Sequence, residues 1–302
     1  MPERVLLTGA SGFVGRAVIA PLLARGVELH AVSRGSRSTP GVTWHAADLL
    51  DAREARALVR DIRPHTLLHG AWYVEHGLFW SSPENARWLE ASTTLAHAFA
   101  AVGGRRFVGL GTCAEYAARD VDDDAPWPET RRIAPATPYG AAKAELHARL
   151  SGHPRLGVAW ARLFHLFGEG EPPARLVPYV ARTLLDGREA LCDSGHAVRD
   201  YASTDFIGRA LATLALGRVT GAINVASGQG RPIRETVAMV AAMIGRPDLL
   251  RLGARPDPPD DVPCMVADTT RLRRDARFPD RAELDADLAA LVRHLRVTAL
   301  TR

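Results

Sequence analysis

Short apolar runs alternate with longer amphipathic segments through the first half of the chain. The short runs predict buried strands, and the longer segments, in which apolar residues recur every three to four positions, predict helices. Strands are expected at residues 5–7, 27–33, 42–47, 65–69, 106–110 and 158–164, and helices at 14–23, 51–62, 83–102 and from 139 onwards. Repeated strand, helix and strand units predict an α/β fold with a doubly wound parallel sheet, whose ligands lie at the carboxyl ends of the strands.

The pattern weakens after residue 164, where prolines become frequent. Helices are expected at 177–185, at 233–244 and at the end of the chain, a strand at 222–226, and loops at 120–138 and 255–263. We therefore expect a sheet domain of residues 1–164, to which the strand near 222–226 returns. Residues 165–302 are expected to form mainly a smaller lobe that covers the cleft and binds substrate.

Three glycines, Gly9, Gly12 and Gly15, follow the first strand and open the first helix. In a Rossmann-type fold such glycines permit the tight turn, the approach of a pyrophosphate to the backbone and the close packing of the helix on the sheet. The spacing is GxxGxxG, whereas the commonest fingerprint is GxGxxG. The turn predicts a dinucleotide site. Its expected contacts are Gly9, Ser11, Gly12, Phe13, Val14 and Gly15.

The residues after the second strand indicate which dinucleotide is bound. NAD-binding proteins usually carry an acid there for the ribose hydroxyls, and this chain has Ser33 and Arg34 instead. An arginine with a neighbouring hydroxyl would accept a 2′-phosphate, which favours NADP, with NAD as the alternative. In the other interpretation Arg34 is a solvated loop residue beside Arg37. Further expected cofactor contacts, at the ends of the third and fourth strands, are Asp48, Leu49, Gly70, Ala71 and Trp72.

Lys143 is the only lysine in a chain that otherwise uses arginine for its basic positions. Lysine differs from arginine in having a tunable pKa, so its retention indicates chemistry, although chance is the alternative. Tyr139 lies four residues earlier, which places both side chains on one face of a helix. A phenol, with an ordinary pKa of about 10, needs a nearby cation to act as an acid or base near neutrality. We predict that Lys143 is this cation.

Composition excludes several other functions. The net charge is +4, but the arginines are scattered among acids, so no nucleic-acid partner is expected. Cys113, Cys192 and Cys264 are far apart, and the eleven histidines show no metal-ligand spacing on a helix, so neither a disulfide framework nor a metal site is expected. The longest apolar run is too short for a membrane span and no signal peptide is expected, which predicts a cytoplasmic protein.

Several motifs occur together in an order typical of one family. They are the glycine turn, Thr112 at a strand end, Tyr139 with Lys143, the Arg162–Gly168 segment, Arg199-Asp200-Tyr201 followed by Asp205, and the Asn224–Gly228 segment. Together they resemble the extended short-chain dehydrogenase/reductase family, of the NAD-dependent epimerase/dehydratase type, over nearly the whole chain. Most members of that family act on nucleotide-linked sugars. Many are homodimers that pair through helices near residues 85–102 and 138–151, so the resemblance implies a nucleotide-sugar substrate and a homodimer.

The resemblance also implies roles for individual residues. Tyr139 would exchange a proton with the sugar oxygen, and Lys143 would hold the nicotinamide ribose and lower the phenol's pKa. Thr112 would hydrogen-bond the same sugar oxygen, unless its hydroxyl only caps the strand. Arg199 would grip the substrate diphosphate. Arg255 is either a second such contact or a surface arginine.

Departures from the family pattern narrow the reaction. Sugar-nucleotide 4,6-dehydratases carry an Asp-Glu pair after the threonine, where this chain has Cys113 and Ala114, so dehydration is not expected. Cys113 is either a base or a small buried thiol. His165 replaces a common asparagine and either contacts the sugar, carries a proton or only packs. Glu115 either binds sugar hydroxyls or caps its loop. The expected substrate contacts are Thr112, Cys113, His165, Arg199 and Arg255.

These inferences favour an NADPH-dependent reductase of a nucleotide-linked keto-deoxy sugar, of the 4-ketoreductase type. The first alternative is a nucleotide-sugar 4-epimerase, which uses the same residues with tightly bound NAD. The second is a non-catalytic dinucleotide-binding sensor or scaffold, which has no need for Tyr139 and Lys143. A carbonyl substrate without a nucleotide is a further possibility.

Overall fold

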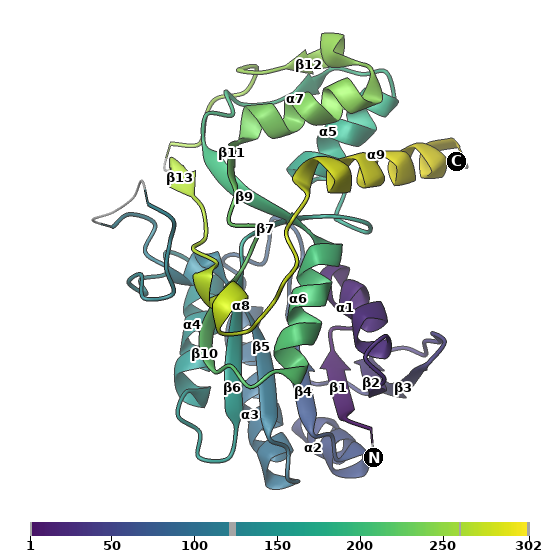
Figure 1. The fold of residues 1–302 in the computed structure, drawn as a ribbon, viewed down its shortest axis with the longest axis vertical. Helices are drawn as coiled ribbons and strands as arrows, with labels where there is room; N and C mark the ends of the chain where they lie inside the picture. Colours follow the sequence, from purple (N-terminus) through teal and green to yellow (C-terminus); the bar gives the residue numbers. More distant parts are fainter. Residues whose placement is uncertain (1, 121–124, 260, 301–302) are drawn as a thin grey trace.

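A parallel sheet with helices on both faces forms the centre of the fold (Figure 1). The computed structural model describes residues 2–120, 125–259 and 261–300. Within this part the sheet has seven strands in the order β10-β6-β5-β4-β1-β2-β3. They are β1 (Arg4–Thr8), β2 (Glu28–Ser33), β3 (Val42–Ala46), β4 (Thr66–His69), β5 (Arg106–Thr112), β6 (Gly157–Leu163) and β10 (Gly221–Val225). All neighbouring strands run parallel, which confirms the predicted Rossmann-type sheet.

Helices cover both faces of the sheet because its central strands are buried on both sides. Every residue of β4 and β5 is buried. On one face lie α1 (Phe13–Leu23) and α6 (Thr204–Leu216), and on the other α2 (Ala52–Ile62), α3 (Glu84–Ala101) and α4 (Pro138–Leu150). Each face therefore has an apolar core of its own.

Local sequence signals set the ends of two helices near the ligand edge. The Asp51 side chain accepts hydrogen bonds from the first turn of α2. The helix ends at Ile62, and its C-cap Arg63, just before Pro64, is in the left-handed conformation. The Thr137 hydroxyl caps α4, with Pro138 in its first turn. Tyr139 therefore lies in the first turn of α4, one residue later than the helix start.

The helix α6 was not predicted, because the sequence pattern is weak after residue 164. Its residues are apolar on several sides, and nine of them are buried, so no single apolar stripe marks it in the sequence. Gly208 lies so close to Ala17 of α1 that a larger side chain would clash with the α1 backbone. The segment after residue 164 thus contributes a helix as well as β10 to the main sheet domain.

Most of the remaining C-terminal elements form a second layer beyond the carboxyl ends of the strands, whereas α8 (Thr270–Arg274) packs beside β10 of the main sheet (Figure 1). A small sheet contains β7 (His165–Phe167), β9 (Val198–Ser203), β11 (Gly230–Pro232) and β13 (Cys264–Met265). Beside it α5 (Leu176–Leu185), α7 (Ile233–Ile244) and α9 (Leu284–Leu300) share a separate apolar core. The shorter elements are η1 (Cys113–Glu115), β8 (Ala190–Leu191), η2 (Pro247–Leu249), β12 (Leu250–Arg251) and α8 (Thr270–Arg274).

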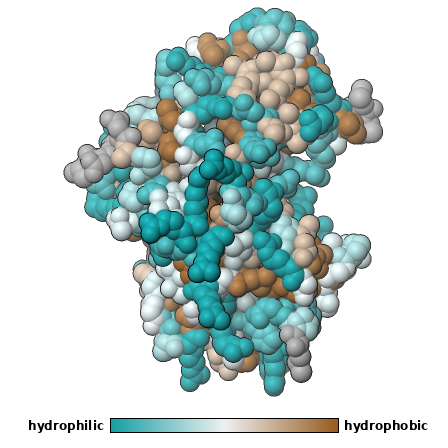
Figure 2. All heavy atoms as spheres, viewed as in Figure 1, coloured by the Kyte–Doolittle hydropathy of each residue, from teal (hydrophilic) through white to brown (hydrophobic). Residues whose placement is uncertain are grey.

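The two expected loops are irregular where they are described. Residues 125–137 and 255–259 contain no helix or strand, while residues 121–124 and 260 lie outside the described part. Figure 2 shows that hydrophilic side chains cover most of one face of the molecule and that hydrophobic ones form small separate patches there. Within the described ranges no helix is both long and apolar enough to cross a membrane.

Candidate active site

The glycine turn lies where the carboxyl ends of β1 and β4 meet. Gly9 has φ +70°, and a Cβ there would lie 2.6 Å from the carbonyl carbon of Gly70. A Cβ on Gly15 would clash with the Gly9 backbone, and one on Gly12 would lie 3.1 Å from the Gly9 carbonyl oxygen. The three glycines thus allow a turn too tight for larger residues.

The turn fits a dinucleotide pyrophosphate. No side chain caps α1, whose N-cap is Gly12, and its first turn holds no acidic residue. The first N–H groups of a helix have no partner within the helix, and they attract anions. The backbone amides at Phe13 and Val14 are therefore suited to phosphate oxygens, as the sequence predicts.

A buried polar chain fixes the neighbouring strand ends. The Thr8 hydroxyl accepts hydrogen bonds from the backbone of Gly70 (3.1 Å) and Ala71 (3.2 Å) and lies 2.8 Å from His69 Nδ1. The other ring nitrogen of His69 lies 2.8 Å from the Ser92 hydroxyl. Burial lowers the pKa of His69 to about 3, so this histidine is neutral and structural.

Arg34 is exposed at the end of β2, and no described residue forms an ion pair with its guanidinium. The neighbouring Ser33 hydroxyl donates its proton to the Gly35 carbonyl and so shapes the turn. At the end of β3 the Asp48 carboxylate accepts from the Leu50 amide at 3.0 Å, and Leu49 is buried. The side chain of Arg34 is thus available to a ligand at the edge beside β2.

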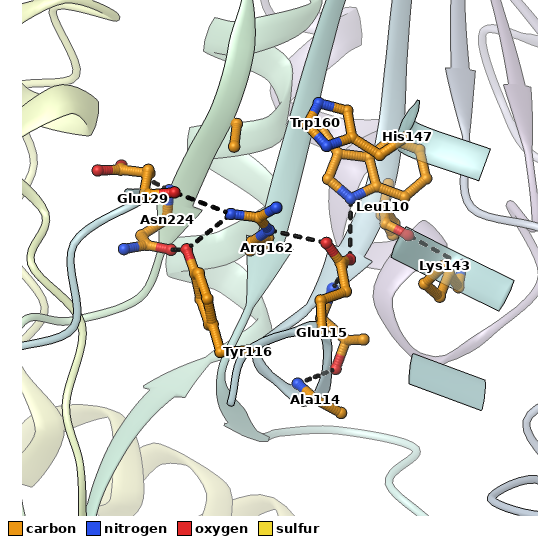
Figure 3. A network of polar contacts seen from close by, with 12 residues as sticks. Leu110, Ala114, Glu115, Tyr116, Glu129, Lys143, His147, Trp160, Arg162 and Asn224 are labelled. Carbon is orange, nitrogen blue, oxygen red and sulfur yellow. Dashed lines mark hydrogen bonds and ion pairs between the residues drawn. The ribbon is translucent and has the colours of Figure 1, made fainter. Parts of the chain in front are cut away.

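Tyr139 and Lys143 share one face of α4. Lys143 Nζ lies 5.9 Å from the centre of the Tyr139 ring, and the lysine side chain is buried. The ammonium donates to the Leu110 carbonyl at 2.8 Å (Figure 3) and lies 3.9 Å from the centre of the Trp72 ring. Burial lowers the pKa of Lys143 to about 7, although Glu115 opposes this shift. The indole of Trp72 is therefore packed against the lysine, whereas the sequence analysis placed Trp72 among the expected cofactor contacts.

The pKa of Tyr139 is shifted in the direction opposite to the one expected. Burial of the phenol raises it above its usual range, and the charges of Glu115 and Cys113 act in the same sense. A hydrogen bond with Thr112 and the charge of Arg175 lower it only in part. The net shift is therefore upward because burial has the larger effect, and the expectation that Lys143 lowers the phenol's pKa stays a prediction.

Thr112 ends β5 beside this tyrosine. Its hydroxyl accepts from the Ala114 amide at 3.2 Å, so it caps η1 and contacts Tyr139 at the same time. Burial raises the pKa of Cys113 to about 12. The thiol is therefore protonated at neutral pH, which argues against Cys113 as a base.

Glu115 lies in a buried polar network with Trp160 and Arg162 (Figure 3) and holds Thr112 in place through its backbone amide. The fully buried carboxylate accepts from the Thr112 amide at 2.9 Å and from Trp160 Nε1 at 2.8 Å, and it pairs with Arg162 Nε at 2.7 Å. Arg162 also donates to the Tyr116 hydroxyl at 3.0 Å. Both carboxylate oxygens are used within the protein, so Glu115 caps its loop and is not a sugar ligand.

The C-terminal lobe presents His165 and Arg199 towards the same centre. The His165 ring stacks near Tyr201, with ring centres 5.5 Å apart, and its buried Nδ1 has no hydrogen-bond partner among the described residues. Burial, with help from Arg199 and Arg175, lowers the pKa of His165 to about 3. A neutral imidazole with a free nitrogen suits a hydrogen bond to a ligand better than a proton relay near neutrality.

Arg199 is buried and largely engaged by its own lobe. It donates to the carbonyls of Val198 (2.9 Å) and Val262 (2.6 Å) and pairs with Asp261. Its charge lowers the pKa of Cys113, which places it on the catalytic side of the lobe. The structure thus brings Arg199, Cys113 and Tyr139 into one electrostatic neighbourhood.

Arg255 lies on another part of the lobe. Its guanidinium donates to the Tyr179 hydroxyl at 3.1 Å and is 5.1 Å from the centre of that ring. Both residues border a hollow of about 400 Å³, lined also by Ala174, Leu176, Leu191, Cys192 and Asp193. A second hollow, of about 240 Å³, shares Asp193 and is bordered by Asp261, the partner of Arg199. The two hollows therefore adjoin at Asp193, and Arg255 borders one of them while the partner of Arg199 borders the other.

Arg175 is a site residue that the sequence did not reveal. It lies at the start of α5, 5.8 Å from the centre of the Phe13 ring, and pairs with Glu171 at 3.0 Å. Burial raises the pKa of Glu171 to about 7, and one of its buried oxygens lacks a partner in the described part of the chain. The charge of Arg175 also lowers the pKa values of Tyr139 and His165, so it acts on two of the expected site residues. Nothing in an arginine-rich sequence distinguishes it from its neighbours.

Across residues 2–120, 125–259 and 261–300, no group of three or more His, Cys, Asp or Glu side chains is arranged to hold a metal ion.

Comparisons with known proteins agree with this geometry. The UDP-glucose 4-epimerase of Streptomyces lividans is 27% identical over 277 residues, which cover 82% of this chain and 83% of that protein. The dTDP-6-deoxy-L-talose 4-dehydrogenase (NAD(P)(+)) of Kitasatospora kifunensis is 27% identical over 278 residues, which cover 85% of this chain and 84% of that one. The solved structure of the Thermus thermophilus UDP-glucose 4-epimerase in complex with NAD superposes with a TM-score of 0.85 at 25% identity, over 97% and 99% of the two chains.

The family model described as the NAD dependent epimerase/dehydratase family matches residues 5–226. This match includes the glycine turn, Thr112, Tyr139 and Lys143, on which the resemblance was based. The chain therefore belongs to the NAD dependent epimerase/dehydratase family.

Proposed function

We propose that the protein is an NADPH-dependent reductase of a nucleotide-linked keto-deoxy sugar, of the 4-ketoreductase type. The observation that carries the proposal is the placement of Tyr139 on one face of α4 with Lys143, whose Nζ lies 5.9 Å from the centre of the phenol ring. The buried phenol carries its proton at neutral pH. A protonated phenol can donate to a carbonyl oxygen as that carbonyl becomes a hydroxyl.

The neighbouring residues support this direction of reaction. The Thr112 hydroxyl can hydrogen-bond the same carbonyl oxygen and stabilise the charge that develops on it. Cys113 and Ala114 occupy the positions where dehydratases of the family carry acids, and the protonated Cys113 thiol offers no base. The site is therefore suited to proton donation and lacks the groups needed to expel water.

The bound dinucleotide would supply the hydride. The first-turn amides of α1, at Phe13 and Val14, would hold its pyrophosphate. The Lys143 ammonium uses one N–H group in its hydrogen bond to the Leu110 carbonyl, so its other N–H groups can donate to ribose hydroxyls. Arg34, exposed and without an ion pair to any described residue, supports NADP over NAD, because a guanidinium binds a 2′-phosphate well.

The substrate would extend from Tyr139 into the lobe. We assign the sugar to the space between Thr112 and His165 and the nucleotide diphosphate to Arg199 and Arg255. The hollow of about 400 Å³ beside Arg255 falls within the usual size range of small-molecule pockets. The relative from Kitasatospora kifunensis, whose name specifies a 4-dehydrogenase of a dTDP-6-deoxy sugar, supports this class of substrate.

A 4-epimerase with tightly bound NAD is the second candidate. The UDP-glucose 4-epimerase relatives, one of them solved with NAD, favour it. A reductase consumes one NADPH for each carbonyl reduced, whereas an epimerase turns over without net oxidation of added cofactor. A non-catalytic dinucleotide sensor would do neither.

The first experiment is a screen of NADPH consumption against a small set of keto-sugar nucleotides that differ in base and in deoxygenation. We expect consumption with at least one dTDP- or UDP-linked 4-keto-6-deoxy sugar. Conversion of UDP-glucose to UDP-galactose with no NADPH consumption in the screen would overturn the reductase proposal in favour of the epimerase.

Arg34→Asp tests the cofactor assignment. Reversing the charge opposite a 2′-phosphate should shift the NADP-to-NAD preference, measured as the ratio of kcat/KM values, by at least about tenfold. Arg37→Asp is the matched control, because it changes the same net charge three residues away. An equal shift in both variants would contradict a specific role for Arg34.

We also propose the arrangement of the whole molecule. The residue 1–164 domain would bind the dinucleotide, and the lobe of residues 165–302 would bind substrate, with α6 and β10 joining the former. Homodimer pairing would use α3 and α4, whose outer faces carry the exposed pair of Arg149 and Glu90. A cytoplasmic location is in keeping with Cys113 and Cys192, which form no disulfide.

A further inference from the structure

Asn85 is a buried polar side chain near the start of α3 that no step of the proposed reaction uses. Its amide nitrogen donates to the carbonyls of Phe79 (2.7 Å) and Ser82 (2.9 Å), and its amide oxygen accepts from Trp72 Nε1 at 2.9 Å. Asn85 therefore joins the Trp72 indole to the segment of residues 79–82, which we call the 79–82 segment.

The face of the same indole lies against the buried ammonium of Lys143. The distance from Nζ to the ring centre is 3.9 Å, and Trp72 is 8% exposed, so water is largely excluded from the contact. A cation over a tryptophan face is attracted by the ring quadrupole, and more strongly when desolvated. Trp88 supports the indole from a ring distance of 6.3 Å. Trp72 thus provides a seat for Lys143.

The 79–82 segment also contacts the other member of the catalytic pair. The Trp80 carbonyl accepts a hydrogen bond from the Tyr139 amide at 3.1 Å. The Phe79 and Trp80 rings lie edge-on to the Tyr139 ring, at centre distances of 4.8 Å and 5.7 Å. Contacts therefore run continuously from Lys143 through Trp72, Asn85 and the 79–82 segment to Tyr139.

We propose that Trp72 and Asn85 are positioning residues of the proposed reaction. The Trp72 indole seats the Lys143 ammonium, and Asn85 fixes that seat to the segment that packs on Tyr139. The placement of the two catalytic side chains is thereby set by one connected group of contacts. This inference deepens the proposed function and depends on it for its catalytic meaning, whereas the seat itself can be tested without turnover.

Lys143 allows that test because it is the only lysine of the chain. With 13C-labelled lysine, the protein without a lysine-containing tag gives one side-chain NMR signal, whose shift with pH reports the titration of this ammonium. The groups that influence the titration are Glu115, which favours the charged form, and His69, which is near enough to interact with it. Tyr139 faces it across the helix surface. Glu115, His69 and Tyr139 are unchanged in the variants below. A change in the midpoint of the Lys143 titration therefore reports the contribution of the Trp72 indole.

Trp72→Leu removes the aromatic face, and Trp72→Phe keeps a smaller face but loses the bond to Asn85. We expect the midpoint of the Lys143 titration to fall in both, and by about one pH unit or more in Trp72→Leu. Trp88→Phe is the matched control, since it alters the tryptophan beside Trp72 and leaves the indole under the lysine in place, and its midpoint should equal that of wild type. Equal midpoints in wild type and both Trp72 variants would overturn the proposal that the Trp72 indole stabilises the Lys143 ammonium. If Trp72→Leu does not fold, Trp72→Phe decides alone.

Asn85→Ala tests the connection. Asn85→Ala should lower the midpoint of the Lys143 titration, as Trp72→Phe does. The double variant Trp72→Phe/Asn85→Ala should lower this midpoint no further than the more effective single change, because both changes break the same hydrogen bond. An unchanged midpoint in Asn85→Ala would overturn the role of Asn85. In turnover, the alkaline limb of the kcat profile should move to lower pH in step with the midpoint. Failure to find any substrate would count against the proposed reductase activity. The order of the Lys143 titration midpoints among the variants would still test whether the Trp72 indole stabilises the Lys143 ammonium.

Discussion

The two sides of the candidate active site hold their charged groups in different ways. On the sheet side Lys143 and Glu115 are buried and their contacts are fixed by strands and by α4. On the lobe side Arg255 is exposed, and Arg175 is about one third exposed and paired with Glu171. Burial makes charges on the sheet side sensitive to any lost partner, whereas solvent moderates changes on the lobe side. The chemistry is therefore expected on the rigid side, and adjustable substrate binding on the other.

The largest expected effect is on the rigid side. Tyr139→Phe removes the proton donor, so kcat should fall by about 10²–10⁴-fold, while the affinity for NADPH, measured by fluorescence titration, should remain close to wild type. Tyr73→Phe is the control, because Tyr73 is hydrogen-bonded to Glu75 near the surface. Retention of full activity by Tyr139→Phe would remove the tyrosine from its role.

Glu115→Gln should be the most destabilising of the changes considered. It leaves Arg162 buried without its charge partner, and such a loss costs about 3–5 kcal/mol in the free energy of unfolding. Glu90→Gln breaks the exposed pair with Arg149 and should cost no more than about 1 kcal/mol. The free energies of unfolding of both variants and of wild type can be compared by urea unfolding. An equal loss of stability in the two variants would contradict the distinction between buried and exposed ion pairs.

Stability should depend on pH through Lys143. Its pKa is about 7 in the folded chain and near 10.5 when unfolded, so the unfolded state binds more protons between these values. The free energy of unfolding of the cofactor-free chain should therefore rise with pH between about 7 and 9, by at most about 1.4 kcal/mol per pH unit from this group. Above that range the raised pKa values of Cys113 and Tyr139 act in the opposite direction. Lys143→Met should remove the rise, and an identical slope in both proteins would show that Lys143 is not the cause.

The smallest effect is expected on the lobe side. Arg255→Ala removes an exposed guanidinium that stacks on Tyr179, so KM for the nucleotide sugar should rise by no more than about fivefold with kcat unchanged. Steady-state kinetics separates the two constants. A fall in kcat with KM constant would mean that Arg255 acts on the reaction itself.

Sequence predicted the sheet side well because its signals are local. The strands, the glycine turn and the spacing of Tyr139 and Lys143 depend on neighbouring residues, and their order indicated the fold. The helix α6 was not predicted, because its apolar residues face several directions and form no single stripe.

Features that depend on contacts between distant segments could not be read from the sequence. Arg175 reaches Phe13 across the fold, and Asn85 joins Trp72 to the 79–82 segment. The burial that raises the pKa of Tyr139 could not be predicted for the same reason. Lys143 could be identified from its spacing, but this burial arises only when the fold surrounds the phenol.

The most direct test of the central claim is isotope transfer from the cofactor. Wild-type enzyme would be given a 4-keto-6-deoxy sugar nucleotide and NADPH deuterated on either face of the nicotinamide, and the product analysed by NMR. The account predicts that one of the two labelled cofactors places a deuterium on the former carbonyl carbon, with one NADPH oxidised for each hydroxyl formed. A sugar product that forms without deuterium from either labelled cofactor, and without NADPH oxidation, would contradict it.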